Sequence, residues 1–225
     1  MTSNVKSLSS QAVAAFTEME LIMKVLILGA TGATGRLVVD QALLAGHSVR
    51  ALVRSPEKLT GSTPALEVVT GQATNTDDVA RAMSGVDVVI STLGSNGGTV
   101  MADATRAIIA GAAAGGAHRM VMLSSFAVAR DRLSRPAKLM SSLAMAAAIK
   151  DKTAAEELLR ASDMDWTIGH SVRLTNGPSI GAAKALPEGT RLGLGDTVAR
   201  ADVAAWLLAA ATDQFRGSRT VAIAA

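Results

Sequence analysis

The chain has 225 residues, of which 49% are hydrophobic, so it is long enough for one domain with a substantial core. The absence of cysteine excludes disulfides and thiol catalysis, and three scattered histidines argue against a metal site. Interleaved charges with a net value of +3, few aromatic residues and no long apolar stretch favour a cytoplasmic protein with no nucleic-acid or membrane partner.

Residues 1–22 differ in composition from the rest of the chain. They are Ser-rich and lack the basic start and continuous apolar core of a secretory signal. We interpret them as an N-terminal extension with some helix. No linker divides the remainder, so residues 23–225 are expected to form one domain, as a monomer or a homodimer.

From residue 23 onward, short apolar runs alternate with longer segments of helical period. The runs predict strands at residues 24–28, 48–53, 66–70, 86–91, 119–124, 166–170 and 219–224. The longer segments predict helices at residues 35–45, 77–83, 99–114, 139–161 and 200–211. Asn75 or Thr76 is expected to cap the second of these helices. This alternation predicts an α/β fold, a Rossmann-type doubly wound parallel sheet.

Residues 175–197 interrupt the alternation with closely spaced glycines and prolines. A small loop-rich C-terminal region is therefore expected. Such a loop can close over the ligand crevice as a substrate region, or it can be a plain surface connection.

Three glycines, Gly29, Gly32 and Gly35, follow the first predicted strand at intervals of three residues. Side chains at such positions block a tight turn, the approach of the backbone to a diphosphate, or the packing of helix on strand. The N-terminus of the following helix then offers N–H groups to phosphates. The motif predicts a dinucleotide-binding loop.

The second predicted strand ends in basic residues. NAD-binding chains place a carboxylate about 20 residues beyond the loop, where it holds the ribose hydroxyls. This chain has Arg54 there, with Lys58 one helical turn on. Paired hydrogen bonds from an arginine suit a 2′-phosphate, which favours NADP (NADPH) as the cofactor over NAD. The alternative is that both residues are simply solvated.

Four segments, GATGATGRLVVDQALLAGHSVRALVRSPEKL, VISTLG, MVMLSSF and KTAAEELLRASDMDWTI, resemble the atypical short-chain dehydrogenase/reductases. More narrowly, the chain is similar to NAD(P)H-binding proteins of the NmrA-like and biliverdin reductase B (flavin reductase) types. The resemblance covers about residue 23 to the C-terminus.

The resemblance implies a set of cofactor contacts. Gln72 stands where many relatives have aspartate beside the adenine, and its amide can also hydrogen-bond a base. Residues that would line the diphosphate are Gly29, Thr31, Gly32, Ala33, Thr34 and Gly35; Arg54 and Lys58 would contact the adenosine phosphate, and Leu93 and Gly94 the ribose.

The catalytic positions depart from the usual family pattern. Ordinary members use a Tyr-x-x-x-Lys pair; here Lys152 matches the lysine, but position 148 is alanine and the chain has no tyrosine. Ser124 and Ser125 end the fifth predicted strand, and Ser125 matches the family's active-site serine better. His170, beyond the sixth strand, is either a proton donor or a structural residue, and each serine could instead satisfy a backbone group.

These features favour an oxidoreductase in which NADPH passes hydride to a small-molecule planar acceptor such as a flavin, a tetrapyrrole or a quinone. The missing tyrosine equally fits a non-catalytic NADP(H)-binding redox sensor of the NmrA type. Epimerisation of a nucleotide-linked sugar is a third, weaker hypothesis, because such relatives generally retain the tyrosine.

Overall fold

A computed structural model describes residues 22–59, 63–94, 97–129, 133, 145–181, 183–187, 189–191, 193, 195–212 and 217–225. The expected N-terminal extension lies outside the described residues except for Ile22, and so does part of the helix predicted over residues 139–161, namely residues 139–144.

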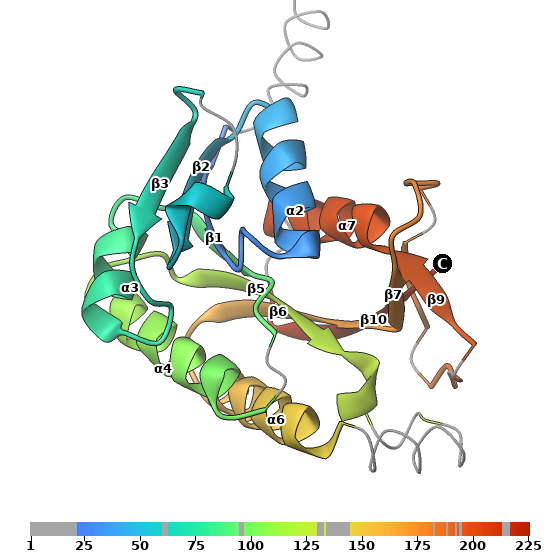
Figure 1. Ribbon diagram of the computed structural model, residues 1–225. Helices are drawn as coiled ribbons and strands as arrows, with labels where there is room; N and C mark the ends of the chain where they lie inside the picture. Colours follow the sequence, from blue (N-terminus) through green and yellow to red (C-terminus); the bar gives the residue numbers. More distant parts are fainter. Residues whose placement is uncertain are drawn as a thin grey trace, which may run out of the picture.

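The centre of the molecule is an eight-stranded sheet with strand order β3-β2-β1-β4-β5-β6-β10-β8 (Figure 1). All neighbouring strands are parallel except β8, which runs antiparallel to β10. The strands are β1 (Lys24–Leu28), β2 (Ser48–Val53), β3 (Leu66–Thr70), β4 (Val88–Ser91), β5 (Arg119–Ser125), β6 (Asp165–Ser171), β8 (Lys184–Ala185) and β10 (Arg219–Ala224).

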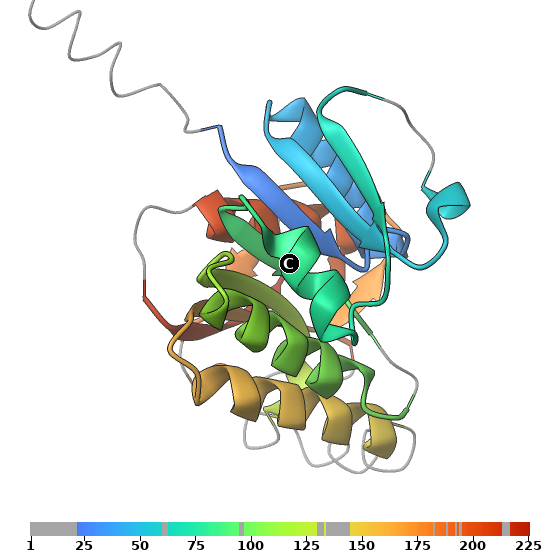
Figure 2. The same cartoon turned by 90° about the vertical axis from the view of Figure 1, so that its left-hand side faces the viewer.

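Helices cover both faces of this sheet, as Figures 1 and 2 show from two directions. One face carries α2 (Ala33–Leu44) and α7 (Arg200–Thr212), which pack on each other. The other carries α3 (Thr76–Met83), α4 (Val100–Ala113) and α6 (Ala146–Arg160), packed in that order. Each layer encloses its own cluster of buried aliphatic side chains, so β1 and β4, apolar on both sides, are buried completely or nearly so.

This architecture confirms the predicted doubly wound α/β fold, and the boundaries of most elements lie within two residues of those expected. The Asn75 side chain caps α3 as predicted, because its Oδ1 accepts the Asp78 N–H at 2.9 Å. The helix after the glycine loop begins at Ala33, earlier than the expected residue 35.

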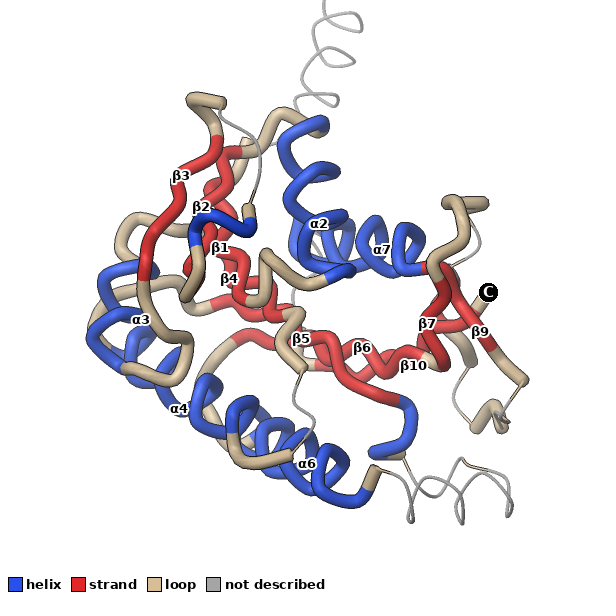
Figure 3. The backbone as a smooth tube through the Cα atoms, in the orientation of Figure 1, coloured by secondary structure: helices blue, strands red, loops and turns tan. Residues whose placement is uncertain are grey.

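The region after β6 contains more regular structure than the loop expected there. β7 (Arg173–Thr175) and β9 (Thr197–Ala199) form a separate two-stranded parallel sheet beside the end of β10 (Figure 3). The short strand β8 pairs with the otherwise open edge of β10. Pairing of this kind satisfies backbone groups that a plain loop would leave to water.

The loop after β7 is tied to α7. Asp202, in the first turn of that helix and only 2% exposed, accepts a hydrogen bond from the Ser179 hydroxyl at 2.5 Å. It also accepts the N–H groups of Ile180 and Gly181 at 3.1 and 3.0 Å. A buried carboxylate therefore anchors the loop that follows β7.

Within the part of the chain that the structure describes, no helix combines the length and the apolar character required to cross a bilayer.

Candidate functional site

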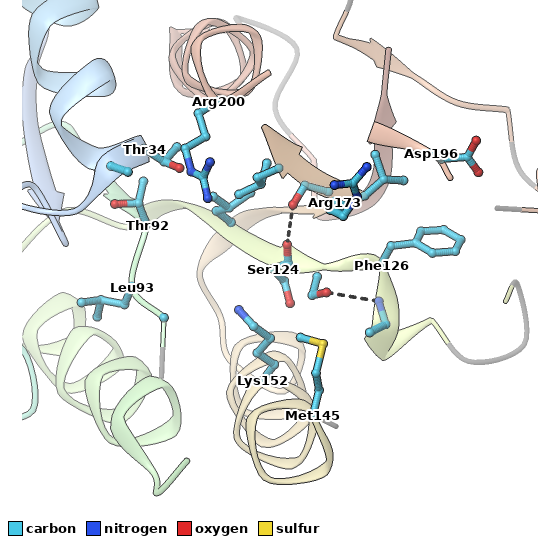
Figure 4. A pocket seen from close by; sticks show the side chains of 18 of the residues that line it. Thr34, Thr92, Leu93, Ser124, Phe126, Met145, Lys152, Arg173, Asp196 and Arg200 are labelled. Carbon is cyan, nitrogen blue, oxygen red and sulfur yellow. Dashed lines mark hydrogen bonds between the residues drawn. The ribbon is translucent and has the colours of Figure 1, made fainter. Parts of the chain in front are cut away.

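The site lies where the strand order reverses. β1 is flanked by β2 on one side and β4 on the other, and the chain leaves β1 toward α2 but β4 toward α4, on opposite faces. Ligands of doubly wound folds bind in the crevice that this divergence opens at the carboxyl ends of the strands. A cavity of about 720 Å³ occupies this place (Figure 4). Its wall includes residues of the glycine loop, the ends of β4, β5 and β6, α6, and the start of α7.

The glycine loop is closed tightly upon itself. Gly29 has a φ of +84°, which only glycine adopts without strain, and its carbonyl oxygen accepts the Gly32 N–H at 2.9 Å. A Cβ at Gly35 would lie 2.0 Å from that same oxygen. The spacing of these glycines thus reflects close packing of backbone against backbone, as the sequence predicted.

The N-terminus of α2 opens into the cavity. Its N-cap, Gly32, is exposed and makes no side-chain cap hydrogen bond, and the cavity wall includes Gly32, Ala33 and Thr34. N–H groups of the first helical turn are therefore available to an anion, and the positive end of the helix dipole favours one. This loop fits the diphosphate of a dinucleotide.

The N-terminus of α4, the helix that follows β4, is already occupied. The buried carboxylate of Asp151, on α6, accepts the N–H groups of Met101 and Ala102, both at 3.0 Å. The two helices therefore present different N-termini: that of α2 is uncapped, and that of α4 is neutralised by the protein itself.

The residues expected to contact the adenosine end of the cofactor follow the carboxyl ends of β2 and β3. Arg54 follows β2, and Gln72 follows β3 beyond Gly71, whose N–H donates to the Val53 carbonyl at 3.0 Å. Arg54, Gln72 and Lys58 are all exposed, and Lys58 ends the short 3-10 helix η1 (Pro56–Lys58). Arg36, on α2, donates to the Lys58 carbonyl at 2.9 Å and thereby joins the glycine loop to this segment.

Three serine hydroxyls in the cavity wall differ in where their protons are held. The Ser124 hydroxyl donates to Glu156 Oε1 at 2.5 Å, and the Ser171 hydroxyl donates to the Ser124 carbonyl at 3.2 Å. Ser125 Oγ accepts the Ala127 N–H at 3.3 Å (Figure 4). Because an accepted bond leaves the hydroxyl proton available, Ser125 can donate a hydrogen bond into the cavity.

Behind Ser124 lies a buried charged group. Glu156, on α6, has no exposed surface; it receives His170 Nε2 at 2.9 Å and Arg160 Nη2 at 2.7 Å. Burial alone would raise the pKa of the Glu156 carboxyl, but the hydrogen bond with His170 and the contacts with Ser124 and Arg160 bring that pKa below its ordinary value. The carboxylate therefore stays ionised, and His170 faces it rather than the cavity wall.

Lys152 stands one helical turn before Glu156 and lines the cavity. Its Nζ contacts the sulfur of Met101 at 3.4 Å. Burial lowers the pKa of the Lys152 ammonium, although the charges of Glu156 and Asp151 act in the opposite direction. A lysine in this setting is receptive to an additional anion or hydroxyl group.

The structure thus brings together many of the predicted site residues but not all of them. Those in the cavity wall are Gly32, Ala33, Thr34, Leu93, Gly94, Ser124, Ser125 and Lys152. Arg54, Lys58 and Gln72 are not in the cavity wall: Arg54 follows β2, Gln72 follows β3 and Lys58 ends η1. Gly29 and Gly35 form the inner turn of the loop, and Thr31 lies between them. The roles assigned to all these residues stay predictions.

Sequence reasoning missed several residues of the site. Wall residues that it did not single out include Phe126, Leu133, Met145, Arg173, Asp196 and Arg200. It also missed Glu156, although a signal existed: Ile149, Lys152, Glu156 and Leu159 recur at helical spacing, which places them on one face.

Comparisons with known proteins agree with this geometry. The NAD(P)H-binding family model matches residues 29–214. The chain is 41% identical over 104 residues to (4-alkanoyl-5-oxo-2,5-dihydrofuran-3-yl)methyl phosphate reductase of Streptomyces griseus, covering 46% of this chain and 35% of that one. It is 30% identical over 211 residues to the uncharacterized sugar epimerase YhfK of Bacillus subtilis, covering 88% and 92% of the two chains.

Among solved structures, ChuY, an anaerobilin reductase from Escherichia coli O157:H7, is 27% identical with a TM-score of 0.73, covering 89% of this chain and 96% of that one. The chain spans only 35%, 65% and 39% of the lengths of three curated relatives that it matches. The family model, by contrast, covers most of the chain, from the glycine loop through the strand ends to α7. The protein therefore belongs to the NAD(P)H-binding family of atypical short-chain dehydrogenase/reductases, a family of NAD(P)H-dependent oxidoreductases.

Proposed function

We propose that this protein is a reductase that uses NADPH to reduce a planar small-molecule acceptor such as a flavin, a tetrapyrrole or a quinone. The observation that carries the proposal is the continuity of the cavity. Its wall runs from the open N-terminus of α2 to an apolar surface formed by Phe126, Leu133 and Met145. One space can thus hold the cofactor and, against that apolar surface, the ring of an acceptor.

Reduction of such an acceptor requires one hydride and one proton. A bound NADPH supplies the hydride, and its nicotinamide carries that chemistry. The chain has no tyrosine to give the proton, but the Ser125 hydroxyl can donate a hydrogen bond to the acceptor atom that becomes protonated. Ser125 is half-buried, so water can replenish the proton after transfer. Ser124, whose proton is held by Glu156, can only accept from a ligand.

Two relatives support this class of reaction. ChuY is an anaerobilin reductase, and the Streptomyces protein is a reductase of a furan-ring methyl phosphate. The similarity to an uncharacterized sugar epimerase does not favour epimerisation, since the tyrosine that the resemblance associates with that activity is absent from the whole chain.

Replacing Ser125 with alanine should lower kcat for acceptor reduction by about 10 to 100-fold, the range expected for loss of one hydrogen-bond or proton donor. The dissociation constant of NADPH should change little, because the cofactor's phosphates are held elsewhere. NADPH absorbance would be followed with flavin mononucleotide, a tetrapyrrole and a quinone in turn.

The matched control is Ser125→Thr, which keeps a hydroxyl and should retain most of the activity. Absence of turnover with every acceptor, despite tight NADPH binding by the unaltered protein, would overturn the reductase proposal and leave the NmrA-type sensor as the better hypothesis.

We also propose that the cofactor is NADPH rather than NADH, on the basis of Arg54 and Lys58 at the end of β2. Arg54→Ala should weaken NADPH binding by about 10 to 100-fold, since a charge-assisted pair with the 2′-phosphate is lost. NADH, which lacks that phosphate, should be affected much less. Both constants can be measured from the fluorescence of the bound nicotinamide.

An exposed arginine elsewhere, Arg106 on α4, provides the control for net charge. Arg106→Ala should leave the ratio of the two constants unaltered. Equal weakening of NADPH and NADH by Arg54→Ala would show that Arg54 does not contact the phosphate.

A further inference from the structure

The cavity wall carries more positively charged than negatively charged side chains. Among the described wall residues there are three cations, Lys152, Arg173 and Arg200, and one carboxylate, Asp196. That carboxylate is engaged by its own loop, because Asp196 Oδ2 accepts the Gly193 N–H at 2.7 Å. The cavity therefore has a surplus of positive charge that ligands must balance.

The three cations occupy different places, as Figure 4 shows. Lys152 rises from α6 on one side of the cavity, whereas Arg200 and Arg173 lie on the opposite side. In this view Arg200 is the nearer of the two to Thr34 of the glycine loop. It also donates from Nη1 to Asn176 Oδ1 at 2.6 Å. Arg200 is therefore placed to contact the cofactor held by the glycine loop. Arg173 is placed to contact an acceptor bound farther from that loop.

Arg173 is well prepared to bind an anion. Its backbone is held in place because β7 pairs with β9, with Arg173 opposite Thr197. Its side chain is exposed, and within the described part of the chain no hydrogen bond or ion pair occupies the guanidinium. A guanidinium matches the two oxygens of a carboxylate or phosphate with parallel hydrogen bonds.

The neighbours of Arg173 are apolar. Val172 and Leu174 flank it in sequence, and both line the cavity together with Phe126 and Met145. A ring lying on this apolar part of the wall shares one cavity with Arg173, whose long side chain can reach a group attached to the ring. The burial that lowers the Lys152 pKa points the same way, since an incoming anion offsets the cost of a buried ammonium.

We propose that Arg173 selects acceptors that carry a carboxylate or phosphate group on a chain attached to the planar ring. This inference rests on the proposed reductase function for the identity of the ring, but the recognition of the anionic group stands on the cavity itself. The acceptor class is accordingly an anionic ring compound rather than a neutral quinone.

Two matched pairs of compounds test the proposal. Riboflavin and flavin mononucleotide share one ring system and differ by a phosphate; biliverdin and its dimethyl ester differ by two free carboxylates. The unaltered protein should show a higher kcat/KM for the anionic member of at least one pair. Arg173→Ala should lower that anionic-to-neutral ratio by about 10 to 100-fold, and Arg173→Lys should restore part of it.

The control variant is Arg191→Ala, which removes an exposed arginine of the same region that does not line the cavity. Its ratio should equal that of the unaltered protein. A preference in the flavin pair alone identifies phosphate, and one in the biliverdin pair alone identifies carboxylate. An anionic-to-neutral ratio near one in both pairs, or a ratio unaffected by Arg173→Ala, would overturn the proposal.

Binding separates this inference from the proposed function. Dissociation constants of the two flavins, measured by fluorescence quenching with saturating NADP⁺, should show the same dependence on Arg173. If no compound is reduced but flavin mononucleotide still binds better than riboflavin through Arg173, the hydride-transfer proposal fails and the selection by Arg173 holds. Equal binding of both flavins and of both biliverdins would contradict the selection, whatever the activity.

Discussion

Replacing Glu156 with alanine is expected to lower the free energy of unfolding by about 3–5 kcal/mol. The carboxylate is fully buried and is the common partner of Ser124, His170 and Arg160. Its removal leaves a buried histidine and a buried hydroxyl without their partner, in addition to a cavity. Since whole domains are stable by only about 5–15 kcal/mol, this loss is severe. Urea unfolding followed by circular dichroism measures it.

The neighbouring Glu157 offers a matched control, because it is exposed on the same helix. Glu157→Ala should alter the free energy of unfolding by no more than about 0.5 kcal/mol. A similar loss in both variants would mean that helix α6, and not the buried contacts of Glu156, determines the effect.

The milder variant Glu156→Gln tests whether the contribution of Glu156 to stability depends on pH. The pKa of Glu156 in the folded protein lies below its ordinary value of 4.5, so ionisation stabilises the fold at any pH above that value. This contribution disappears as the pH falls through the folded-state pKa. The difference in unfolding free energy between the unaltered protein and Glu156→Gln should thus be largest near neutral pH and should shrink below about pH 4.5. A difference that grows on acidification would contradict the assignment.

The second large effect concerns the glycine loop. Gly35→Ala is expected to reduce NADPH affinity by at least about 100-fold, because the new Cβ would lie 2.0 Å from the Gly29 carbonyl oxygen and 2.9 Å from Ala30 Cα. Backbone rather than a flexible side chain must move, which displaces the N–H groups at the start of α2 from the diphosphate. Titration of NADPH fluorescence measures the affinity.

Gly195→Ala is the appropriate comparison, since a Cβ there meets nothing within 4 Å and the residue has no positive φ. It should bind NADPH like the unaltered protein. Retention of full affinity by Gly35→Ala would show that the loop relaxes around the methyl group and that its tight geometry is not required.

Local sequence pattern was sufficient for the fold and for the glycine loop that opens into the cavity. The apolar run of β1, the glycine spacing and the helix that follows are contiguous in the chain, so their geometry is encoded within residues 24–44. The same holds for Ser124 and Ser125, because a strand in a doubly wound sheet presents its carboxyl end to the crevice.

The roles of Glu156, His170 and Arg173 could not be predicted from local sequence pattern. Glu156 and its neighbour Glu157 are indistinguishable by residue type, and only contacts with Ser124 and His170, from two other strands, give the first its role. His170 was expected to be either a proton donor or a structural residue; the structure turns it to Glu156. The strands β7 and β9, whose pairing holds the backbone of Arg173, have three residues each and are too short to show a periodic sequence pattern.

The capping of α4 by Asp151 has a consequence for the direction in which a dinucleotide lies. The helices α2 and α4 follow β1 and β4, the two strands between which the crevice opens, and a dinucleotide has a nucleotide at each end of its diphosphate. Asp151 presents a like charge at one of them, so a diphosphate is repelled from α4 and attracted to α2. If the cofactor binds as we propose, a single carboxylate on α6 helps to set its direction, and we expect the nicotinamide to lie toward Ser125 and the adenine toward Arg54.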